Sequence, residues 1–563
     1  MALRPLLELC LARSLDGLFP TRKAMRELRA RWGKPGDKDG WGASEYFDLV
    51  RDEDASAQVD DKTWADLEFP EIFSSMNSTV TPVGSQVLFR QMREYVHDAQ
   101  VLADRYAAYA RLRSNSALRE GLQRKLLPLR DESNVRIVDF VFGELPPPLR
   151  RRGLLTWWAL ASLGALIVAS VWSWMIWVWL AMVCVNLIVL VRVGLSGRAL
   201  RDMQTLQACL RLVKVANDLG AMHERNPELP GLAKLHAESP NRAKLSKALG
   251  WLLLWSSWSK VFPIMFVVTP LNVVFLVDLV LHVRAMQKFA SLRSGLAASF
   301  ELVGGVDAAI ATASWLVFRQ DHCKPVLVDR AVLDIKDGCH PLLDGGVANS
   351  MRLESHSALV TGSNMAGKTT FIKMLGVNVL LGQTLGFCLA SRATIPRSRV
   401  MASIHADHSV ASGKSHYFSE VETIRSFLAQ QAQGGCTVFV IDELFSGTNT
   451  VERVAIARAV LESLGRRSLV LATTHDIELQ AFLGQHYDLY HFQEDPEVDG
   501  FFDYKLRAGP ATERNAIRLL GEIGFPDAII ANAMTYAEQD LRDAAQNAAG
   551  DGPNVSKRSA GSA

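Results

Sequence analysis

A run of 38 residues without a charged side chain, residues 154–191, restricts the fold of this 563-residue chain more than any other feature. Roughly 20 apolar residues cross a bilayer as a helix, so the run has room for two spans joined by a tight turn near residues 170–174. Arg152 and Arg192 flank it, which favours both ends on one, cytoplasmic side. We therefore predict a transmembrane helical hairpin at residues 153–192. A buried helix pair in a large soluble core is the alternative.

A second apolar stretch predicts a further transmembrane hairpin at residues 249–284. Lys260 and Asp278 interrupt it, and Pro263 and Pro270 break its helical continuity. Charged residues at membrane depth can mark a transport pathway. Because Lys260 lies near a turn and Asp278 near one end, snorkelling to the interface is the simpler interpretation.

Composition limits the function classes. The 61 Lys and Arg residues nearly balance the 59 Asp and Glu residues, so DNA contact would have to be local. Seven cysteines form no CxxC pair, which argues against a zinc site and against a secreted disulfide framework. The N-terminal residues contain no apolar run long enough for a signal peptide, so we expect the N-terminus to stay in the cytoplasm.

The strongest chemical pattern is a phosphate-binding loop, GSNMAGKT, at residues 362–369. An apolar run, 358–360, precedes it and a helix-forming segment, 370–381, follows, which is the context such a loop requires. Its backbone N–H groups would face phosphate oxygens, Lys368 would neutralise the β and γ phosphates, and Thr369 would offer its hydroxyl to Mg²⁺. A chance match is the alternative. The predicted nucleotide-binding residues here are Gly362, Ser363, Asn364, Met365, Ala366, Gly367, Lys368, Thr369 and Thr370.

Two later apolar runs end in residues suited to phosphate chemistry. Residues 437–441 form a continuous apolar strand followed by Asp442 and Glu443. Asp442 would hold Mg²⁺ through its water shell, and Glu443 would act as general base on the attacking water. Residues 468–472 form another strand, after which His475 is placed to sense or stabilise the γ phosphate. The alternatives are a strand ending in solvated acids and a structural histidine.

These motifs together resemble the ATPase domain of the MutS mismatch-repair family. The similar segments are TGSNMAGKTT, VFVIDELFSGTNT and LATTHD, in this order. The resemblance implies ATP and Mg²⁺ as cofactors, with Glu443, His475 and Lys368 catalytic and Thr369 and Asp442 at the metal. Segment ASGKSHYFSE, 411–420, implies a homodimer in which Ser415 reaches the partner's nucleotide. Val347 occupies the family's nucleobase contact, and Gly346 stands where an aromatic platform is expected.

The upstream segment is similar to the opening of the family's helical core. It comprises residues 66–70 followed by Thr79, Thr81, Gly84 and Leu88. Little chain precedes it, so we expect no mismatch-recognition domain, and we find no Phe-x-Glu wedge in a suitable setting.

The fold class that follows is an α/β P-loop ATPase domain of MutS or ABC type, C-terminal to an all-α arm region containing transmembrane hairpins. The remaining predicted units are an N-terminal helical segment 1–44, a helical core 45–152, a helical arm 193–248, a helical connector 285–335, the ATPase domain 336–540 and a disordered tail 541–563. Residues 326–335, at the end of the connector, alternate like a strand.

Three functions fit these observations. The first is a dimeric, multi-pass membrane ATPase whose nucleotide state drives a clamp on DNA in mismatch repair or recombination, with both termini and the ATPase domain in the cytoplasm. The second is an ABC-type transporter half, which the missing Leu-Ser-Gly-Gly-Gln signature and the small number of spans argue against. The third is a membrane organiser that uses ATP only to dimerise, for which slow turnover without DNA stimulation is expected.

Overall fold

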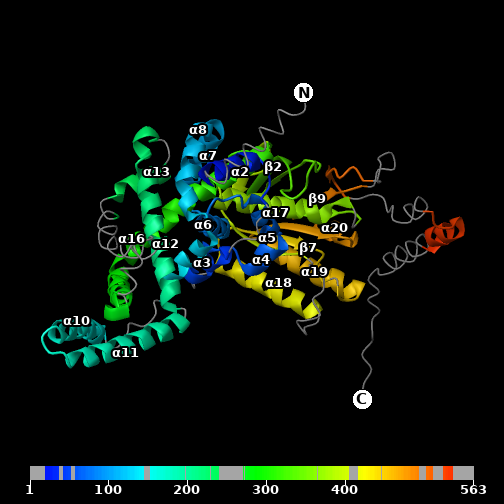
Figure 1. Ribbon diagram of the computed structural model, residues 1–563. Coiled ribbons are helices and arrows are strands. Elements are labelled where there is room, and N and C mark those ends of the chain that lie inside the picture. Colours follow the sequence, from blue (N-terminus) through cyan, green and yellow to red (C-terminus); the bar gives the residue numbers. More distant parts are fainter. Residues whose placement is uncertain are drawn as a thin grey trace, which may run out of the picture.

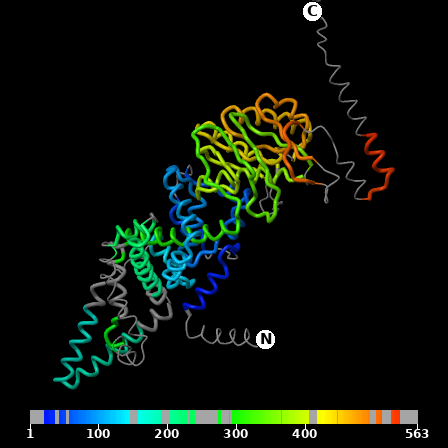
Figure 2. The backbone as a smooth tube through the Cα atoms, turned by 90° about the horizontal axis from the view of Figure 1, so that it is seen from above, coloured from blue at the N-terminus to red at the C-terminus, as the bar shows by residue number. Residues whose placement is uncertain are grey.

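A long helix, α16 (Val277–Phe318), joins a helical part of the molecule to an α/β part (Figures 1 and 2). The computed structural model describes residues 20–36, 42–51, 57–144, 152–196, 198–227, 230–239, 242, 271, 273–363, 366–404, 416–445, 447–493, 502–510 and 524–536. The predicted disordered tail, 541–563, lies outside these residues, as does most of the predicted second hairpin, 249–270.

The helical part consists of short helices packed around α16. They are α2 (Pro20–Arg31), α3 (Ala43–Val50), α4 (Asp61–Asp66), α5 (Phe69–Met76), α6 (Pro82–Arg93), α7 (Ala99–Ser114), α8 (Ser116–Leu126), α9 (Ile137–Val141), α12 (Arg198–Gly220) and α13 (Pro230–Ala237), with 3₁₀ turns η2 (Leu127–Leu129), η3 (Glu132–Arg136) and η4 (His223–Arg225). The arm predicted as helix over 193–248 is therefore interrupted after Gly220.

A buried carboxylate fastens α6 to α16. Asp307, on α16, is fully buried and accepts hydrogen bonds from Val80 N (3.0 Å), Thr81 N (2.8 Å) and the Thr81 hydroxyl (2.7 Å). The Thr81 side chain in turn caps α6 by accepting from Gly84 N at 2.9 Å. Removing either partner would leave buried polar groups unpaired, so the helix pair depends on this contact.

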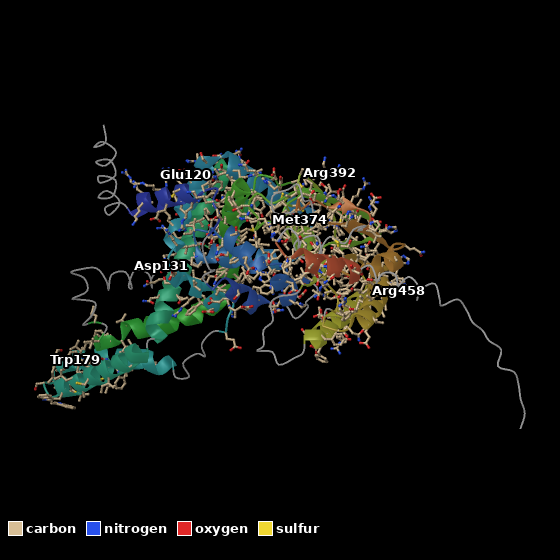
Figure 3. All side chains as sticks on the ribbon, turned by 90° about the vertical axis from the view of Figure 1, so that its right-hand side faces the viewer. Glu120, Asp131, Trp179, Met374, Arg392 and Arg458 are labelled. Atoms are coloured by element: carbon tan, nitrogen blue, oxygen red, sulfur yellow. The ribbon has the colours of Figure 1, made fainter. Side chains whose placement is uncertain are left out.

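The predicted helical hairpin is present as α10 (Arg152–Ala169) and α11 (Met175–Ser196), joined by a turn at residues 170–174. It projects from the rest of the molecule, and Trp179 marks it in Figure 3. Its apolar helical segments, Trp157–Ala169 and Met175–Val189, are shorter than 18 residues, the minimum length for a membrane span. Within the described residues, Arg293–Phe318 is long and apolar enough to cross a membrane, but 67% of its apolar stretch is buried, as in the core helix of a soluble protein.

The α/β part contains two sheets. The strands are β1 (Val326–Val328), β2 (Val332–Gly338), β3 (Asn349–Glu354), β4 (Ser357–Thr361), β5 (Arg392–Pro396), β6 (Arg399–Ser403), β7 (Thr437–Asp442), β8 (Leu469–Thr474), β9 (Tyr487–His491) and β10 (Arg507–Ala508). One sheet has the order β1-β5-β2-β3 and the other β10-β9-β4-β8-β7-β6. In the larger sheet β9, β4, β8, β7 and β6 are parallel, and β10 is antiparallel.

Helices cover both faces of the larger sheet, which explains its continuous apolar strands. Helix α17 (Lys368–Thr384) lies on one face, and α18 (His416–Gln433) and α19 (Thr450–Gly465) lie on the other (Figure 1). In β7, Val438 and Val440 belong to the core on the first side, whereas Phe439 and Ile441 belong to the core on the second. The short helix α20 (Glu478–Leu483) packs on α19.

The α/β part begins earlier than the sequence pattern indicated. Residues 326–335 were expected to form one strand at the end of a helical connector, but a turn at 329–331 separates β1 from β2. Both strands pair with β5, β1 in parallel and β2 antiparallel. A turn that reverses direction inside an alternating run leaves the alternation intact, so the pattern could not reveal it.

Substituting Gly84 tests the contact between α6 and α16. A Cβ atom at Gly84 would lie 2.6 Å from Cγ of Asp307, whose carboxylate is held by its donors and cannot move away. We expect Gly84→Ala to lower the free energy of unfolding by about 1–3 kcal/mol, the usual cost of overpacking. Thermal or urea unfolding of the purified chain measures the change.

The matched control is Gly295→Ala on α16, where an added Cβ meets nothing within 4 Å. Alanine favours a helix over glycine, so this variant should be unchanged or more stable by up to about 1 kcal/mol. Equal behaviour of the two variants would contradict the close packing of α6 on Asp307.

Candidate functional site

Three parallel strands end side by side at one edge of the larger sheet. Strand β8 lies between β4 and β7, with Thr361 opposite Thr474 and Asp442 opposite Thr473. The loop after β4, the acidic pair after β7 and the histidine after β8 therefore meet at the same carboxyl edge, where open α/β sheets bind ligands. The sheet topology brings together three motifs that the sequence spreads over more than a hundred residues.

The loop between β4 and α17 depends on its two glycines. Gly362 has φ 138°, and a Cβ there would lie 2.7 Å from the carbonyl oxygen of Phe492. Gly367 has φ 94° and forms the N-cap of α17, so the helix N-terminus opens directly toward the loop. The Ser363 hydroxyl is buried without a hydrogen-bond partner among the described residues. Asn364 and Met365, predicted to bind the nucleotide, lie outside those residues.

Lys368 carries its positive charge inside this loop. The residue is 1% exposed, and its Nζ donates to the carbonyl oxygen of Gly362 at 2.5 Å. Both ring nitrogens of His475 lie 3.3 Å from the same Nζ. A buried ammonium group next to a helix N-terminus is a strong site for an anion, because the loss of water strengthens its interaction with a phosphate.

A carboxylate links the start of α17 to the end of β7. The Thr369 hydroxyl donates to Oδ2 of Asp442 at 2.8 Å, and the Thr473 hydroxyl donates to the other oxygen. Mg²⁺ prefers oxygen ligands and is usually held by one or two protein groups together with substrate phosphates. The adjoining Thr369 and Asp442 oxygens fit that requirement, and the unpartnered Ser363 hydroxyl adds a polar group to the loop.

Glu443 and His475 form the outer side of the site. Nε2 of His475 lies 2.5 Å from Oε1 of Glu443, and both side chains are partly exposed. Glu443 has φ 49° and Phe445 has φ 60°, in the left-handed region that non-glycine residues rarely occupy. Such backbone strain persists where surrounding structure enforces it and clusters at functional sites. The turn aims the Glu443 carboxylate away from the buried strand and toward the histidine.

An ion pair behind His475 was not foreseen from the sequence. Arg453, on α19, binds Asp476 through two hydrogen bonds of 2.9 and 2.6 Å. This hydrogen bonding raises the pKa of Arg453. A bidentate pair fixes both orientation and distance, so it holds the backbone next to His475. Nothing in the local pattern around Arg453 indicates a partner 23 residues away.

Val347 lies on the approach to β3, with its side chain exposed. The neighbouring Asn349 side chain donates to the carbonyl oxygen of Tyr504 at 2.9 Å and accepts from Leu506 N at 2.8 Å. The Tyr504 ring stands beside the loop, since a Cβ on Gly367 would lie 3.2 Å from its Cδ1 atom. The sequence indicates that Gly346 stands where an aromatic residue is expected, but it does not indicate the half-exposed Tyr504 ring.

The predicted partner-facing residue, Ser415, lies outside the described residues, and α18 begins at His416. Of the remaining predicted residues, Ala366 is buried at the end of the loop, and Thr370 follows Thr369 in the first turn of α17. The structure thus brings Lys368, Thr369, Asp442, Glu443 and His475 into one site.

Comparison with known proteins identifies this region. Residues 358–541 match the family model of MutS domain V. The chain is 33% identical over 227 residues to the DNA mismatch repair protein MutS of Leuconostoc mesenteroides, covering 38% of this chain and 26% of that protein. It is 30% identical over 256 residues to the DNA mismatch repair protein MutS of Thermus aquaticus, covering 44% and 30%. The Endonuclease MutS2 of Carboxydothermus hydrogenoformans is 28% identical over 262 residues, covering 45% and 33%.

These likenesses show that the α/β part, which lies C-terminal to a helical region, is similar to MutS domain V. The matched region spans about a quarter to a third of these three relatives.

Proposed function

We propose that this chain is a MutS-type ATPase that hydrolyses ATP to ADP and phosphate with Mg²⁺. The observation that carries the proposal is the hydrogen bond between Thr369 and Asp442, which places a metal-binding hydroxyl and carboxylate beside the buried Lys368 ammonium. P-loop NTPases bind a Mg²⁺–triphosphate with a loop that surrounds the phosphates and with two oxygen ligands that lie next to each other. The domain V match supports the same function.

Each residue has a distinct task in this mechanism. The loop N–H groups and Lys368 bind the β and γ phosphates, and Thr369 and Asp442 would hold Mg²⁺, which neutralises the charge that develops on the transferred group. Glu443 would accept a proton from the attacking water, because its partly exposed carboxylate lies just beyond the buried strand, beside His475. His475, held between Lys368 and Glu443, orients the base and can donate to the γ phosphate.

Glu443→Gln separates binding from hydrolysis. The amide keeps the size of the side chain but cannot accept the proton, so we expect ATP binding to persist while turnover falls about 100-fold or more. Lys368→Ala should instead weaken ATP binding itself, because it removes the cation that faces the phosphates. Equilibrium binding of ATP and steady-state phosphate release measure the two properties.

Arg458→Ala, at an exposed salt bridge on α19, is a suitable control that should alter neither property. If turnover of the Glu443→Gln protein matched that of the wild type, Glu443 would not be the base.

We further propose that two chains form composite sites. The P-loop covers one side of the nucleotide, and the segment containing Ser415 resembles the part of the family that completes the partner's site. Lys368, Thr369, Asp442 and Glu443 would act within their own chain, while Ser415 would approach the γ phosphate bound by the other chain.

Mixing two inactive variants tests this arrangement. Ser415→Arg and Lys368→Ala should each abolish turnover alone, yet a heterodimer should recover up to about one working site because each chain supplies what the other lacks. Phosphate release from purified heterodimers carrying two different affinity tags is the measurement. Activity no greater than the sum of the homodimers would show that Ser415 acts within its own subunit.

We propose that the hairpin of α10 and α11 anchors the chain in a membrane, with both termini and the ATPase domain in the cytoplasm. At about 1.5 Å per residue the two helices measure about 27 and 33 Å, close to the hydrocarbon thickness of a bilayer. Trp157 and Trp177 on the helices and Trp172 and Trp174 in the turn are each at least 60% exposed, whereas Trp179 is partly buried.

Two polar side chains of the hairpin helices are turned inward. Ser162 and Asn186 are fully buried, and both donate to the carbonyl oxygen of Val274, at 3.1 and 2.6 Å. The Trp158 indole donates to Asn186 at 2.7 Å. The exposed apolar side chains and the pairing of Ser162, Asn186 and Trp158 fit a lipid environment, since an unpaired polar group there costs several kcal/mol. A water-facing helix pair would show the reverse pattern.

Cysteine labelling tests the topology. A cysteine at Ser170 in the turn should react with a membrane-impermeant maleimide from the side opposite the ATPase domain. A cysteine at Asp131, an exposed residue of the helical part, should react from the ATPase side and serves as the control. The Cys184→Ser background removes an exposed native thiol. Labelling of both positions from one side in sealed vesicles would exclude a spanning hairpin.

We propose DNA as the substrate on which the nucleotide-driven clamp acts, in mismatch repair or recombination. The relatives named DNA mismatch repair protein support this choice over the transporter half. The membrane organiser differs in one measurable respect, because its slow turnover would not respond to DNA. The phosphate-release assay above, repeated on detergent-solubilised protein with duplex or branched DNA, separates these two functions.

A further inference from the structure

The edge of the larger sheet is closed by side chains of the helical part. Strand β6 is the outermost parallel strand, so every second N–H group points away from β7. Val400 N donates to the Tyr95 hydroxyl and Ala402 N to the Thr63 hydroxyl, each at 3.0 Å. Ile404 N, just beyond the strand, donates to Oδ2 of Asp66 at 2.8 Å. Side chains of the helical part therefore occupy the hydrogen-bonding groups at the edge of β6, which would otherwise be open to pairing with another strand.

Asp66 is suited to hold the end of β6 firmly. Its side chain is 6% exposed and also accepts from Lys62 Nζ at 2.8 Å. Helix α4, which carries it, is capped by Asp60, and that carboxylate accepts from both the backbone and the hydroxyl of Thr63. The last pairing of β6 with β7 joins Ser403 to Ile441, the residue before Asp442. Asp66 thus holds the end of the strand that lies beside the functional end of β7.

The next two residues contact the opposite side of the site. Leu67 is fully buried against α17, where a Cβ on Gly376 would lie 3.2 Å from its Cδ2 atom. Oε1 of Glu68 accepts from Lys373 Nζ at 2.8 Å, in the second turn of the helix that begins at Lys368. Glu68 itself has φ 57°, an unfavourable left-handed conformation for a non-glycine residue.

Among the described residues, the cation that pairs with Glu68 is Lys373. His340 Nε2 lies 3.9 Å from the other Glu68 oxygen, but burial lowers the pKa of His340 to about 4. The ring is neutral at pH 7, so Lys373 is the cation that Glu68 meets. Because Lys373 belongs to α17, the pair sets the position of the helix whose first residues bind phosphate and metal.

We propose that Asp66 and Glu68 are positioning residues through which the helical part holds the two sides of the nucleotide site. Glu68 fixes α17, and with it Lys368 and Thr369, so it governs nucleotide binding. Asp66 fixes the end of β6 and, through the pairing of Ser403 with Ile441, the end of β7 that carries Asp442 and Glu443, so it governs turnover. Three consecutive residues, 66–68, thereby connect the helical part to both elements. This inference rests on the proposed ATPase function.

Charge exchange tests the role of Glu68. In the full chain, Glu68→Lys and Lys373→Glu should each weaken binding of the fluorescent analogue mant-ATP about tenfold, the effect of losing a charge-assisted hydrogen bond. The double variant should recover to within about threefold of the wild type. The control exchanges the charges of Arg458 and Glu462, an exposed ion pair of 2.9 Å on α19. This exchange should leave mant-ATP binding unchanged.

Asp66 is tested by a different readout. Asp66→Leu should lower the turnover number about tenfold while the Kd for mant-ATP stays within twofold, because the lost acceptor acts on β6 and not on α17. Asp66→Asn retains an acceptor oxygen for Ile404 N and should recover at least half of the turnover. A purely structural role would reduce the fraction of protein that binds and its melting temperature, without separating Kd from turnover.

The outcomes distinguish this inference from the proposed function. Unchanged Kd in both Glu68 and Lys373 variants, failure of the double variant to recover, or a loss confined to the binding-competent fraction would overturn it. A wild-type chain that binds no mant-ATP would overturn the proposed function and this inference together. A wild type that binds and hydrolyses ATP while the variants behave as wild type would overturn the positioning role alone.

Discussion

The carboxylate of Asp442 holds together the parts of this site. It accepts from Thr369 at the start of α17 and from Thr473 near the end of β8, so it joins the phosphate loop to the two strands beside it. Each contact is a short side-chain hydrogen bond in a largely buried setting, where losing a partner costs more than at the surface. Lys368 and Glu443 owe their relative positions to this junction, because one precedes Thr369 and the other follows Asp442. The chemistry proposed for ATP therefore depends on the register of the parallel strands as much as on the motif residues themselves.

Helix α16 extends from the C-terminal end of α17 toward the apolar hairpin. Near its C-terminal end, the centroid of the Trp315 ring lies 6.0 Å from the centroid of the Phe387 ring, just beyond α17. At the other end, Asn186 and Ser162 donate to the carbonyl oxygen of Val274, shortly before the helix begins. The buried Asp307 secures the middle of α16 to α6. A helix of 42 residues held at three places transmits displacement better than a loop would. The arrangement connects α17 physically to the proposed membrane anchor.

Local patterns predicted the parts of the fold that local physics determines. The phosphate loop, the strand ending at Asp442 and the helical hairpin follow from glycine spacing, apolar runs and a turn, and the structure shows them where expected. Contacts between distant residues left no such trace. The pair of Arg453 and Asp476, the ring of Tyr504 beside Gly367 and the hydrogen bond from Ile404 to Asp66 arise from the tertiary arrangement. The break between β1 and β2 was missed because alternation alone does not mark a reversal of chain direction.

The metal site is the most direct test of the account. Mn²⁺ can replace Mg²⁺ at oxygen ligands, and pulsed electron paramagnetic resonance of the full chain with Mn²⁺ and ATP detects phosphorus nuclei next to the metal. The account predicts one Mn²⁺ per chain coupled to phosphorus, with the signal lost in Thr369→Val and in Asp442→Asn but retained in Thr535→Val, whose hydroxyl lies on an exposed helix. Phosphorus coupling that persists unchanged in both site variants would contradict the placement of the nucleotide and metal at this edge of the sheet.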